Sequence, residues 1–473
     1  MTVDTATFEV PVLALPPERF REVLGDRYAE VEDAIERAAR LLDGRVIWHV
    51  NSTARGGGVV ELLQSLLAYA RGGGVDARWL VISGNPEFFA VTKRIHNRLH
   101  GSLGDGGELD ADARRTYEAT VEDAGAEIAA LVGPRDVVVL HDPQTAGLVG
   151  ALTDAAAAVI WRCHVGVDHP NDLARGAWDL LRPYVEPAAA YIFSRQEFVW
   201  DGLEAARVWI GPPTIDAFSA KNQELEPGVV DAILGIAGLL DHAGGDPRFV
   251  RGDGTPAHVR RAVEVDEDRR LDGARPIVCQ VSRWDRLKDP VGVIEGLAAS
   301  LPAVDADLVL AGPAVAAVAD DPEGLEVLDE VGAARSALPE AARSRVHLAC
   351  LPMDDVEENA AIVNALQRRS DVVVQKSLAE GFGLTVAEAM WKRKPVVGSR
   401  VGGIQDQIVD GTSGVLIDDP TDLESFRDAV LGLLADPARA RAVGQAARER
   451  VRDRFLGTAG LLRYLDLLER LLA

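Results

Sequence analysis

The sequence predicts an α/β protein made of two doubly wound, Rossmann-like domains. At 473 residues the chain is too long for one ordinary core, and its 47% hydrophobic and 26% charged residues are typical of an ordered globular protein. Short β-branched runs alternate with helical patterns, as in βαβ units that build a parallel sheet. The alternation stops once and then starts again, so two such domains are expected.

The expected strands fall into two series. The first comprises 45–50, 77–82, 136–140, 158–163 and 189–193, and the second comprises 276–281, 306–312, 345–349, 371–375, 395–399 and 414–418. A stretch at 211–228, which has two adjacent prolines near its start and continues as a polar segment, separates them. We therefore expect an N-terminal domain over 1–215, a C-terminal domain over 216–455 with a helical insertion at about 222–273, and a closing helix within 456–473.

Charge, cysteines and hydropathy exclude several classes of protein. The chain has 50 basic and 74 acidic residues, a net charge of -24, and no basic run longer than 391–394, which argues against nucleic acid as a partner. Cys163, Cys279 and Cys350 lie far apart and form no C-x-x-C pair, so buried thiols in a reducing compartment are expected. The N-terminus lacks a signal-peptide pattern and no apolar run spans a membrane, so a cytoplasmic protein without a membrane partner is expected.

The stretch EGFGLTVAE at 380–388 follows an expected strand and opens an expected helix. Gly381 and Gly383 let the backbone approach a ligand, and the N–H groups at a helix N-terminus favour an anion. Glu380 and Glu388 add carboxylates, which accept hydrogen bonds from the vicinal diols of sugars. The stretch therefore suits a phosphate flanked by two sugars, as in a nucleoside-diphosphate sugar. Taken singly, each glutamate is better explained as a helix cap or a helix-surface residue, but the whole nine-residue string is not.

Four other strand ends carry candidate residues. Arg283 and Lys288 lie on one loop and suit phosphate, although a solvated basic loop is the plainer interpretation. The glycines at 56–58 open a helix, where a phosphate approach and a plain turn are both possible. His141 and His164 follow strands and can bind sugar hydroxyls or lie in the core. Metal binding is disfavoured for His141 and His164, because they are not spaced as a pair of ligands and no cysteine cluster accompanies them.

Together these motifs resemble the retaining GT-B glycosyltransferases of family 4. The resemblance rests on E-x7-E with its EGFG start, the R-x4-K loop and the glycine-rich first βα turn, and it covers nearly the whole chain. The strings NSTARGGGVVELL, HDPQTAGL, WRCHVGVD, VSRWDRLKDP and QKSLAEGFG narrow it to the trehalose glycosyltransferring synthases and the related retaining trehalose phosphorylases. It implies a deep inter-domain cleft and a last helix that packs back on the N-terminal domain.

The resemblance also implies a role for each candidate residue. The residues expected to bind the donor sugar nucleotide are Gly57, Gly58, Arg283, Lys288, Glu380, Gly381, Phe382, Gly383, Leu384 and Glu388. Within this set Arg283 and Lys288 hold the diphosphate, Glu380 the donor glucose and Glu388 the ribose. His164 lies near the carbon that is transferred, and it is counted with Arg283, Lys288 and Glu380 as catalytic. The residues expected to bind the acceptor glucose are His141, Asp142, Gln144 and Arg162.

The activity implied by this resemblance is transfer of glucose from ADP- or UDP-glucose to free glucose, with retention, to give α,α-trehalose. Three alternatives stay open: a retaining trehalose phosphorylase, a transferase with another acceptor, and a catalytically silent sensor of nucleotide sugars. No cofactor and no metal site are required, although Mg²⁺ in solution could assist the diphosphate. A homodimer is compatible with the sequence. One departure from the family pattern is Ser282, where many members carry glycine before the phosphate-binding arginine.

Overall fold

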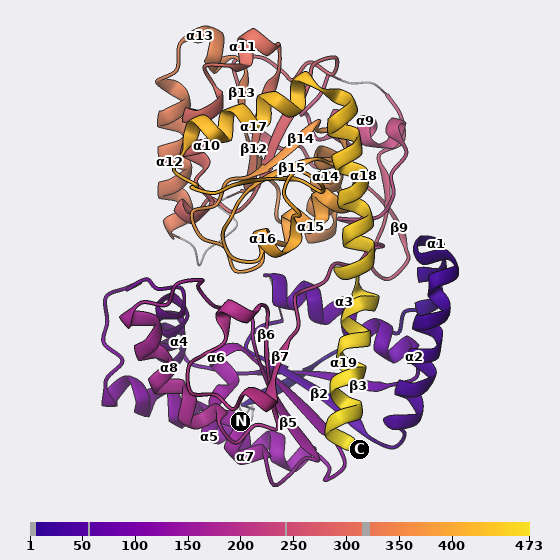
Figure 1. The fold of residues 1–473 in the computed structure, drawn as a ribbon, viewed down its shortest axis with the longest axis vertical. Coiled ribbons are helices and arrows are strands. Elements are labelled where there is room, and N and C mark those ends of the chain that lie inside the picture. Colours follow the sequence, from indigo (N-terminus) through magenta and orange to yellow (C-terminus); the bar gives the residue numbers. More distant parts are fainter. Residues whose placement is uncertain (1–5, 55–56, 242–243, 315–321) are drawn as a thin grey trace. The chain divides into compact units, whose positions relative to one another are not determined.

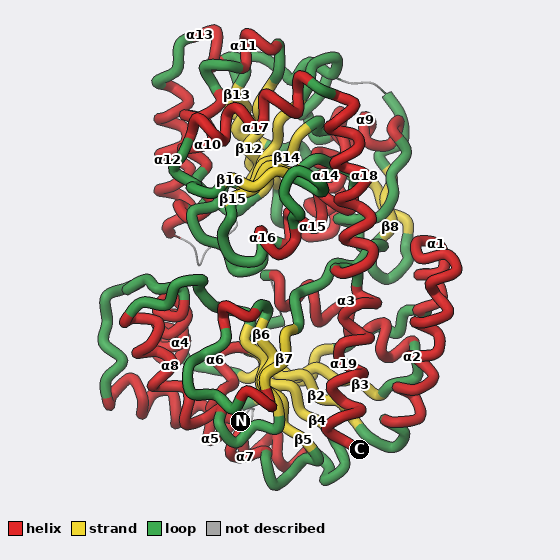
Figure 2. Tube along the Cα trace, in the orientation of Figure 1, coloured by secondary structure: helices red, strands yellow, loops and turns green. Residues whose placement is uncertain are grey.

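The computed structural model describes residues 6–54, 57–241, 244–314 and 322–473, which divide into two compact units. The first unit contains 1–214 and 457–473, and the second contains 215–456. The chain therefore passes from one unit to the other twice. Each unit contains a parallel-dominated sheet with helices on both faces, as the alternating pattern predicts, and the two are drawn in Figures 1 and 2.

The sheet of the first unit has the strand order β1-β3-β2-β4-β5-β6-β7, and only β1 runs antiparallel to its neighbour. Its strands are β1 (Thr7–Val10), β2 (Val46–Asn51), β3 (Asp76–Ile82), β4 (Val137–His141), β5 (Ala158–Cys163), β6 (Ala190–Phe193) and β7 (Val208–Ile210). Its helices are α1 (Arg21–Leu24), α2 (Tyr28–Leu41), α3 (Gly58–Gly72), α4 (Pro86–Leu99), α5 (Ala111–Leu131), α6 (Asp142–Thr145), α7 (Val149–Leu152), α8 (Asp172–Val185) and α19 (Gly457–Leu472).

Both faces of this sheet are buried, because strand residues alternate between two apolar cores. Val138 and Leu140 pack in the core under α4, α5 and α8, whereas Val137 and Val139 pack in the core under α3 and α19. The closing helix α19 contacts both α2 and α3 and contributes Leu467 to the second core. The last helix is thus an integral part of the first unit.

The second unit repeats this arrangement with the order β10-β13-β12-β11-β14-β15-β16, in which only β10 is antiparallel. Its strands are β8 (Arg248–Val250), β9 (Pro256–His258), β10 (Glu264–Asp266), β11 (Ile277–Val281), β12 (Asp307–Pro313), β13 (Val346–Leu351), β14 (Val372–Gln375), β15 (Val396–Ser399) and β16 (Val415–Ile417). Its helices are α9 (Pro227–Ile236), α10 (Pro290–Leu297), α11 (Leu301–Val304), α12 (Pro322–Ser336), α13 (Glu340–Arg343), α14 (Val356–Arg369), α15 (Leu384–Trp391), α16 (Ile404–Gln407), α17 (Leu423–Ala435) and α18 (Pro437–Arg454).

The segment expected as a helical insertion, about 222–273, needs correction. It contains one helix, α9, and three short strands, of which β8 and β9 pair as a hairpin and β10 extends the main sheet. The hairpin turn contains Gly252 and Gly254, and Gly254 adopts a positive φ of +86°. Strands of three residues are too short to show the alternation from which the longer strands were predicted.

Candidate active site

Two loops of the second unit leave the ends of neighbouring parallel strands. The loop after β11 carries Arg283 and Lys288, and the loop after β14 carries Glu380. Since β11 and β14 pair in parallel, their carboxyl ends lie side by side at one edge of the sheet. Ligands of open α/β sheets bind beyond this edge. The sheet order therefore explains how residues far apart in the sequence meet at one place.

Lys288 and Glu380 form an ion pair, with 2.8 Å between Nζ and Oε2. Their side chains are 16% and 11% exposed, so the pair is largely shielded from water and yet reachable. The hydroxyl of Ser377 lies 3.4 Å from the same carboxylate oxygen. An ammonium group suits phosphate oxygens and a carboxylate suits sugar hydroxyls, so the pair offers both kinds of contact at one point.

Arg283 extends further into solvent than Lys288. Its side chain is 63% exposed and donates to Asp285 Oδ2 over 3.2 Å. Asp285 also caps the short helical turn that ends at Lys288, by accepting from the N–H of Leu287 at 2.8 Å. A single carboxylate thus fixes the turn and contacts the arginine.

A second ion pair holds the two loops together behind the first. Lys376, only 1% exposed, lies directly after β14 and pairs with Asp289, and its ammonium group lies 5.9 Å from the centre of the Phe426 ring. Asp289 adopts a left-handed conformation with φ +50° and caps α10 by accepting from the N–H of Gly292. A backbone hydrogen bond of 2.8 Å from Leu378 to Leu287 adds to this link.

The EGFG turn is shaped by close backbone contacts. Gly383 has a φ of +81° and is the N-cap of α15, and no side chain caps this helix. The amide of Gln407 donates to the carbonyl oxygen of Phe382 over 2.6 Å, and the N–H of Gly403 donates to Gly381. A Cβ at Gly402 would lie 1.7 Å from the carbonyl oxygen of Glu380, so only glycine fits there.

Glu388 is buried on α15, with 2% of its side chain exposed. One carboxylate oxygen lies 3.5 Å from the ammonium group of Lys221, and the other, Oε2, has no hydrogen-bond partner among the described residues. Neither plainer interpretation of the two glutamates survives, because Glu380 pairs with Lys288 instead of capping the helix and Glu388 is not on the helix surface. A buried carboxylate oxygen without a partner is costly unless something else satisfies it.

The first unit brings three histidines into a row. Nδ1 of His49 lies 3.0 Å from Nε2 of His141, and Nδ1 of His141 lies 3.1 Å from Nε2 of His164. They come from β2, the end of β4 and the residue after β5, which are neighbouring strands. Within the described part of the chain, no group of three or more His, Cys, Asp or Glu side chains is placed to hold a metal ion.

Asp142 lies beside this row in a strained conformation with φ +65°. Its Oδ1 accepts a hydrogen bond of 2.7 Å from the backbone N–H of His164, and its carbonyl accepts from the indole of Trp161. Burial raises the pKa of Asp142 to about 7, although the bond from His164 opposes the shift. A residue other than glycine with positive φ, at the end of a parallel strand, is typical of a functional site.

The remaining candidates lie close to the same strand ends. Gln144 is partly buried on α6, and Gly57, with φ +83°, is the N-cap of α3, whose first residue is the exposed Gly58. Gly56 lies outside the described residues.

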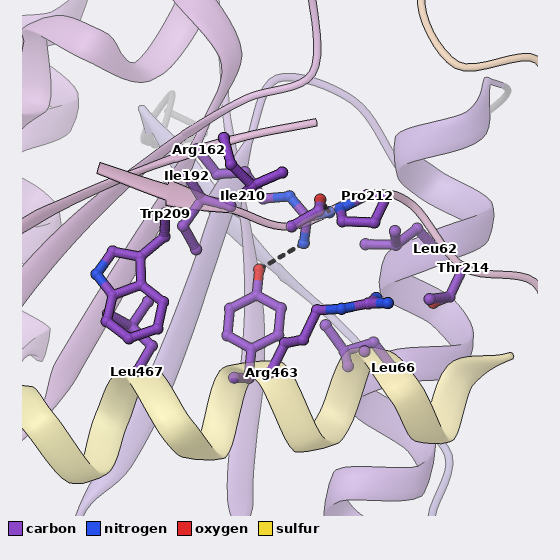
Figure 3. A pocket seen from close by; sticks show the side chains of 13 residues that line it. Leu62, Leu66, Arg162, Ile192, Trp209, Ile210, Pro212, Thr214, Arg463 and Leu467 are labelled. Atoms are coloured by element: carbon purple, nitrogen blue, oxygen red, sulfur yellow. Dashed lines mark hydrogen bonds between the residues drawn. The ribbon is translucent and has the colours of Figure 1, made fainter. Parts of the chain in front are cut away.

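Arg162, an acceptor candidate, is 3% exposed and joins the sheet to α19. It donates to the hydroxyl of Tyr464 over 2.7 Å, the dashed line in Figure 3, and to the carbonyl of Gly211 over 3.1 Å. Figure 3 shows its side chain above α19 in a small pocket that Trp209 and Leu467 also line. In this structure its contacts are made within the protein.

Sequence reasoning missed His49, Lys376, Asp289 and Lys221 as partners of the candidate residues. His49 could have been found from the sequence, because it is a polar residue near the end of the apolar strand RVIWHV. Lys376 also directly follows an apolar strand, as a site residue would.

The fold and the strand-end residues define a glycosyltransferase of the GT-B type. Residues 49–200 match the family described as "Trehalose synthase, N-terminal domain", and 264–450 match "Glycosyl transferases group 1". A trehalose synthase of Thermococcus litoralis is 37% identical over 95% of this chain and 96% of its own length. The chain therefore belongs to the trehalose synthase family of glycosyltransferases.

Two further proteins place this family in context. A trehalose phosphorylase of Pleurotus pulmonarius is 27% identical over 94% of this chain but only 59% of its own length. The structure of a sucrose-phosphate synthase from Thermosynechococcus elongatus superimposes with a TM-score of 0.61 at 18% identity, covering 90% of this chain and 99% of that one. At this identity the likeness shows the fold alone. None of the described helices is long and apolar enough to span a bilayer.

Proposed function

We propose that this chain transfers glucose from ADP-glucose or UDP-glucose to the anomeric hydroxyl of free D-glucose, giving α,α-trehalose and the nucleoside diphosphate. The single observation that carries the proposal is the Lys288–Glu380 pair at 2.8 Å, because it joins a phosphate-binding and a sugar-binding group at one strand edge. Family membership along 95% of the chain supports the choice of trehalose as product.

In this proposal the second unit binds the donor. Arg283 and Lys288 hold the diphosphate, and Glu380 accepts hydrogen bonds from hydroxyls of the donor glucose. Glu388 accepts from the ribose diol, which would satisfy the buried Oε2 that has no partner in the described chain. The backbone N–H groups of Phe382, Gly383 and Leu384, at the start of α15, stabilise negative charge.

The first unit binds the acceptor through His141, Asp142 and Gln144, with His164 close to the carbon that is transferred. Arg162 has a supporting role, since its described contacts go to Tyr464 and Gly211. The inter-domain cleft predicted from the sequence stays a prediction, as does the approach of Gly57 and Gly58 to the phosphates.

The proposed chemistry proceeds on one face of the sugar. As the bond to the diphosphate breaks, the glucosyl ring gains oxocarbenium character and negative charge grows on the phosphate, where Lys288 and Arg283 stabilise it. The departing phosphate accepts the proton of the attacking hydroxyl, so the configuration is retained. A double displacement would need a carboxylate beneath the anomeric carbon, and Glu380 is assigned to the sugar hydroxyls instead. Mg²⁺ in solution is an optional aid to the diphosphate in this scheme.

A retaining trehalose phosphorylase is the second candidate, favoured by the match to the Pleurotus protein over 94% of this chain. In that reaction phosphate would replace the nucleotide. The buried Glu388, with one oxygen unsatisfied, argues against it, because without a ribose nothing in the substrates would bind there.

A product assay with separate donors tests the proposal. Purified protein receives glucose together with ADP-glucose, UDP-glucose or glucose 1-phosphate, and the products are identified by NMR. Trehalose from a nucleotide donor supports the synthase and names the preferred base. Trehalose from glucose 1-phosphate alone favours the phosphorylase instead, and no disaccharide from any donor rejects the acceptor assignment.

A further inference from the structure

The row formed by His49, His141 and His164 is a continuous hydrogen-bonded chain of imidazoles. The two ring-to-ring contacts are 3.0 and 3.1 Å between nitrogens, and consecutive rings are stacked with interplanar angles of 27° and 13°. Each link joins Nδ1 of one ring to Nε2 of the next. Because the links all have the same form, the nitrogen that carries the proton on one ring determines which nitrogen can carry it on the next.

The two ends of this chain differ in their surroundings. His49 is 4% exposed and lines a cavity of about 80 Å³ whose other walls are mainly apolar side chains of α2, α3 and α19. Its Nε2 has no hydrogen-bond partner among the described residues. His164, at the other end, is partly exposed at the carboxyl end of β5. The row of histidines therefore runs from a mainly apolar cavity to the strand edge that holds Asp142.

All three rings are held neutral. Burial lowers the pKa of His49 to about 3 and lowers the pKa values of His141 and His164 well below the usual range, and the charge of Arg162 acts in the same direction. A neutral imidazole has one N–H donor and one acceptor nitrogen. Because His141 uses both nitrogens, its two hydrogen bonds must run in the same sense, and only two arrangements of the protons are possible.

The cavity at His49 favours one of these arrangements, because its walls are mainly apolar and offer few acceptors to an N–H group. If the bonds run from His164 toward His49, His49 carries its proton on Nε2 and leaves an N–H group without a partner. If they run from His49 toward His164, only a lone pair is left there. Orphaned buried N–H groups are rarer in proteins than under-satisfied acceptors. The second sense is therefore favoured, and it leaves the proton of His164 on Nδ1.

We propose that His49 is a positioning residue that, through His141, fixes His164 in the Nδ1–H tautomer and so makes it a hydrogen-bond donor to the substrate. This inference rests on the proposed function, in which His164 lies beside the transferred sugar. His164 then donates to a sugar hydroxyl and takes no proton during the reaction. That role agrees with a mechanism in which the leaving phosphate accepts the acceptor proton.

Two substitutions at His49 test the proposed role of the row of histidines. His49→Leu removes the hydrogen bond while placing an apolar side chain against an apolar cavity, so folding is expected to survive. His49→Asn is the matched control, because its amide nitrogen occupies the place of Nδ1 and still donates to His141. We expect kcat to fall about tenfold in H49L, the loss equivalent to about one net hydrogen bond, and to return to within about twofold in H49N.

The decisive readout is the tautomer of His164, measured by long-range ¹H–¹⁵N correlation spectra of protein labelled with [¹⁵N]histidine and assigned with H164Q. The wild type and H49N are expected to carry the proton on Nδ1, and H49L is expected to show a mixture. A wild-type proton on Nε2, or a spectrum unchanged in H49L, overturns the proposal. If the tautomers are as expected but the wild type makes no trehalose, the role of His49 is confirmed and the proposed function is rejected.

Discussion

Lys288 and Glu380 lie 92 residues apart in the sequence, and yet their side chains meet at 2.8 Å. Each charge offsets part of the desolvation of the other, and the contact holds both groups at one edge of the sheet. In the proposed mechanism, the phosphate and hydroxyl groups of the donor would take over these contacts. Under the same mechanism this ion pair would preorganise the donor site, and preorganised charge is a main source of catalysis.

Substitution of Lys288 by Gln removes the cation from this site. We expect kcat to fall by about 10²–10³-fold, since one preorganised donor to the developing diphosphate charge is lost. Arg286→Gln is the control on the same turn, because Arg286 contacts Glu326 and Glu330 at the surface. Steady-state kinetics should show near wild-type turnover for R286Q. Equal losses in the two variants would contradict the assignment.

Gly402→Ala places a methyl group where the carbonyl of Glu380 lies. The new Cβ would be 1.7 Å from that oxygen, so the EGFG turn must move. A displacement of about 1 Å is expected to lower kcat/KM for the donor about 10²-fold. Gly411→Ala is the control, because Gly411 also has a positive φ, +70°, and a Cβ there would meet no atom within 4 Å. Kinetics of G411A should stay close to wild type despite backbone strain; parallel losses would reject the steric explanation.

The Lys376–Asp289 pair is expected to stabilise the second unit. Lys376→Met removes the ammonium group and leaves Asp289 largely buried without its partner, which costs about 3–5 kcal/mol for a buried pair. Thermal unfolding should therefore begin at a clearly lower temperature. Arg400→Gln breaks an exposed pair with Asp418, and should cost less than about 1 kcal/mol. An unchanged melting curve for K376M would show that the pair does not hold the two loops.

Asp142 predicts a pH dependence for acceptor use. Its pKa is raised to about 7 by burial, so the carboxyl group is protonated below that pH and charged above it. The charged form is the better acceptor for glucose hydroxyls. At saturating donor, kcat/KM for glucose should fall about tenfold per pH unit below pH 7. In Asp142→Asn this fall in kcat/KM below pH 7 should disappear, and activity should be low at every pH. If the variant keeps the fall, another group causes it.

The central strands were predicted well, because strands buried on both faces appear in the sequence as continuous apolar runs. The expected 158–163 coincides with β5, and the other central strands shift by one or two residues. Three edge strands, β1, β7 and β10, were not predicted; each has three or four residues and is partly exposed, and only the short edge strand β16 was expected from the alternating series. Helix α2 was also missed, although its buried face packs under α19.

Of the candidate site, the sequence supplied the residues but not their partners. Glu380 and Lys288 could be assigned from motifs, whereas their direct pairing depends on β11 lying beside β14. The burial of Glu388 and the contacts of Arg162 depend likewise on tertiary packing. His49 was overlooked because its role exists only once three strands bring their side chains together.

The most direct test of the central claim follows the fate of the transferred sugar. The protein is given the preferred nucleotide donor with ¹³C at C1 of its glucose, together with unlabelled glucose, and the products are followed by ¹³C NMR. The account predicts a non-reducing disaccharide with label at one anomeric carbon and α configuration at both. Label in a β-linked product, or only in free glucose, would contradict it.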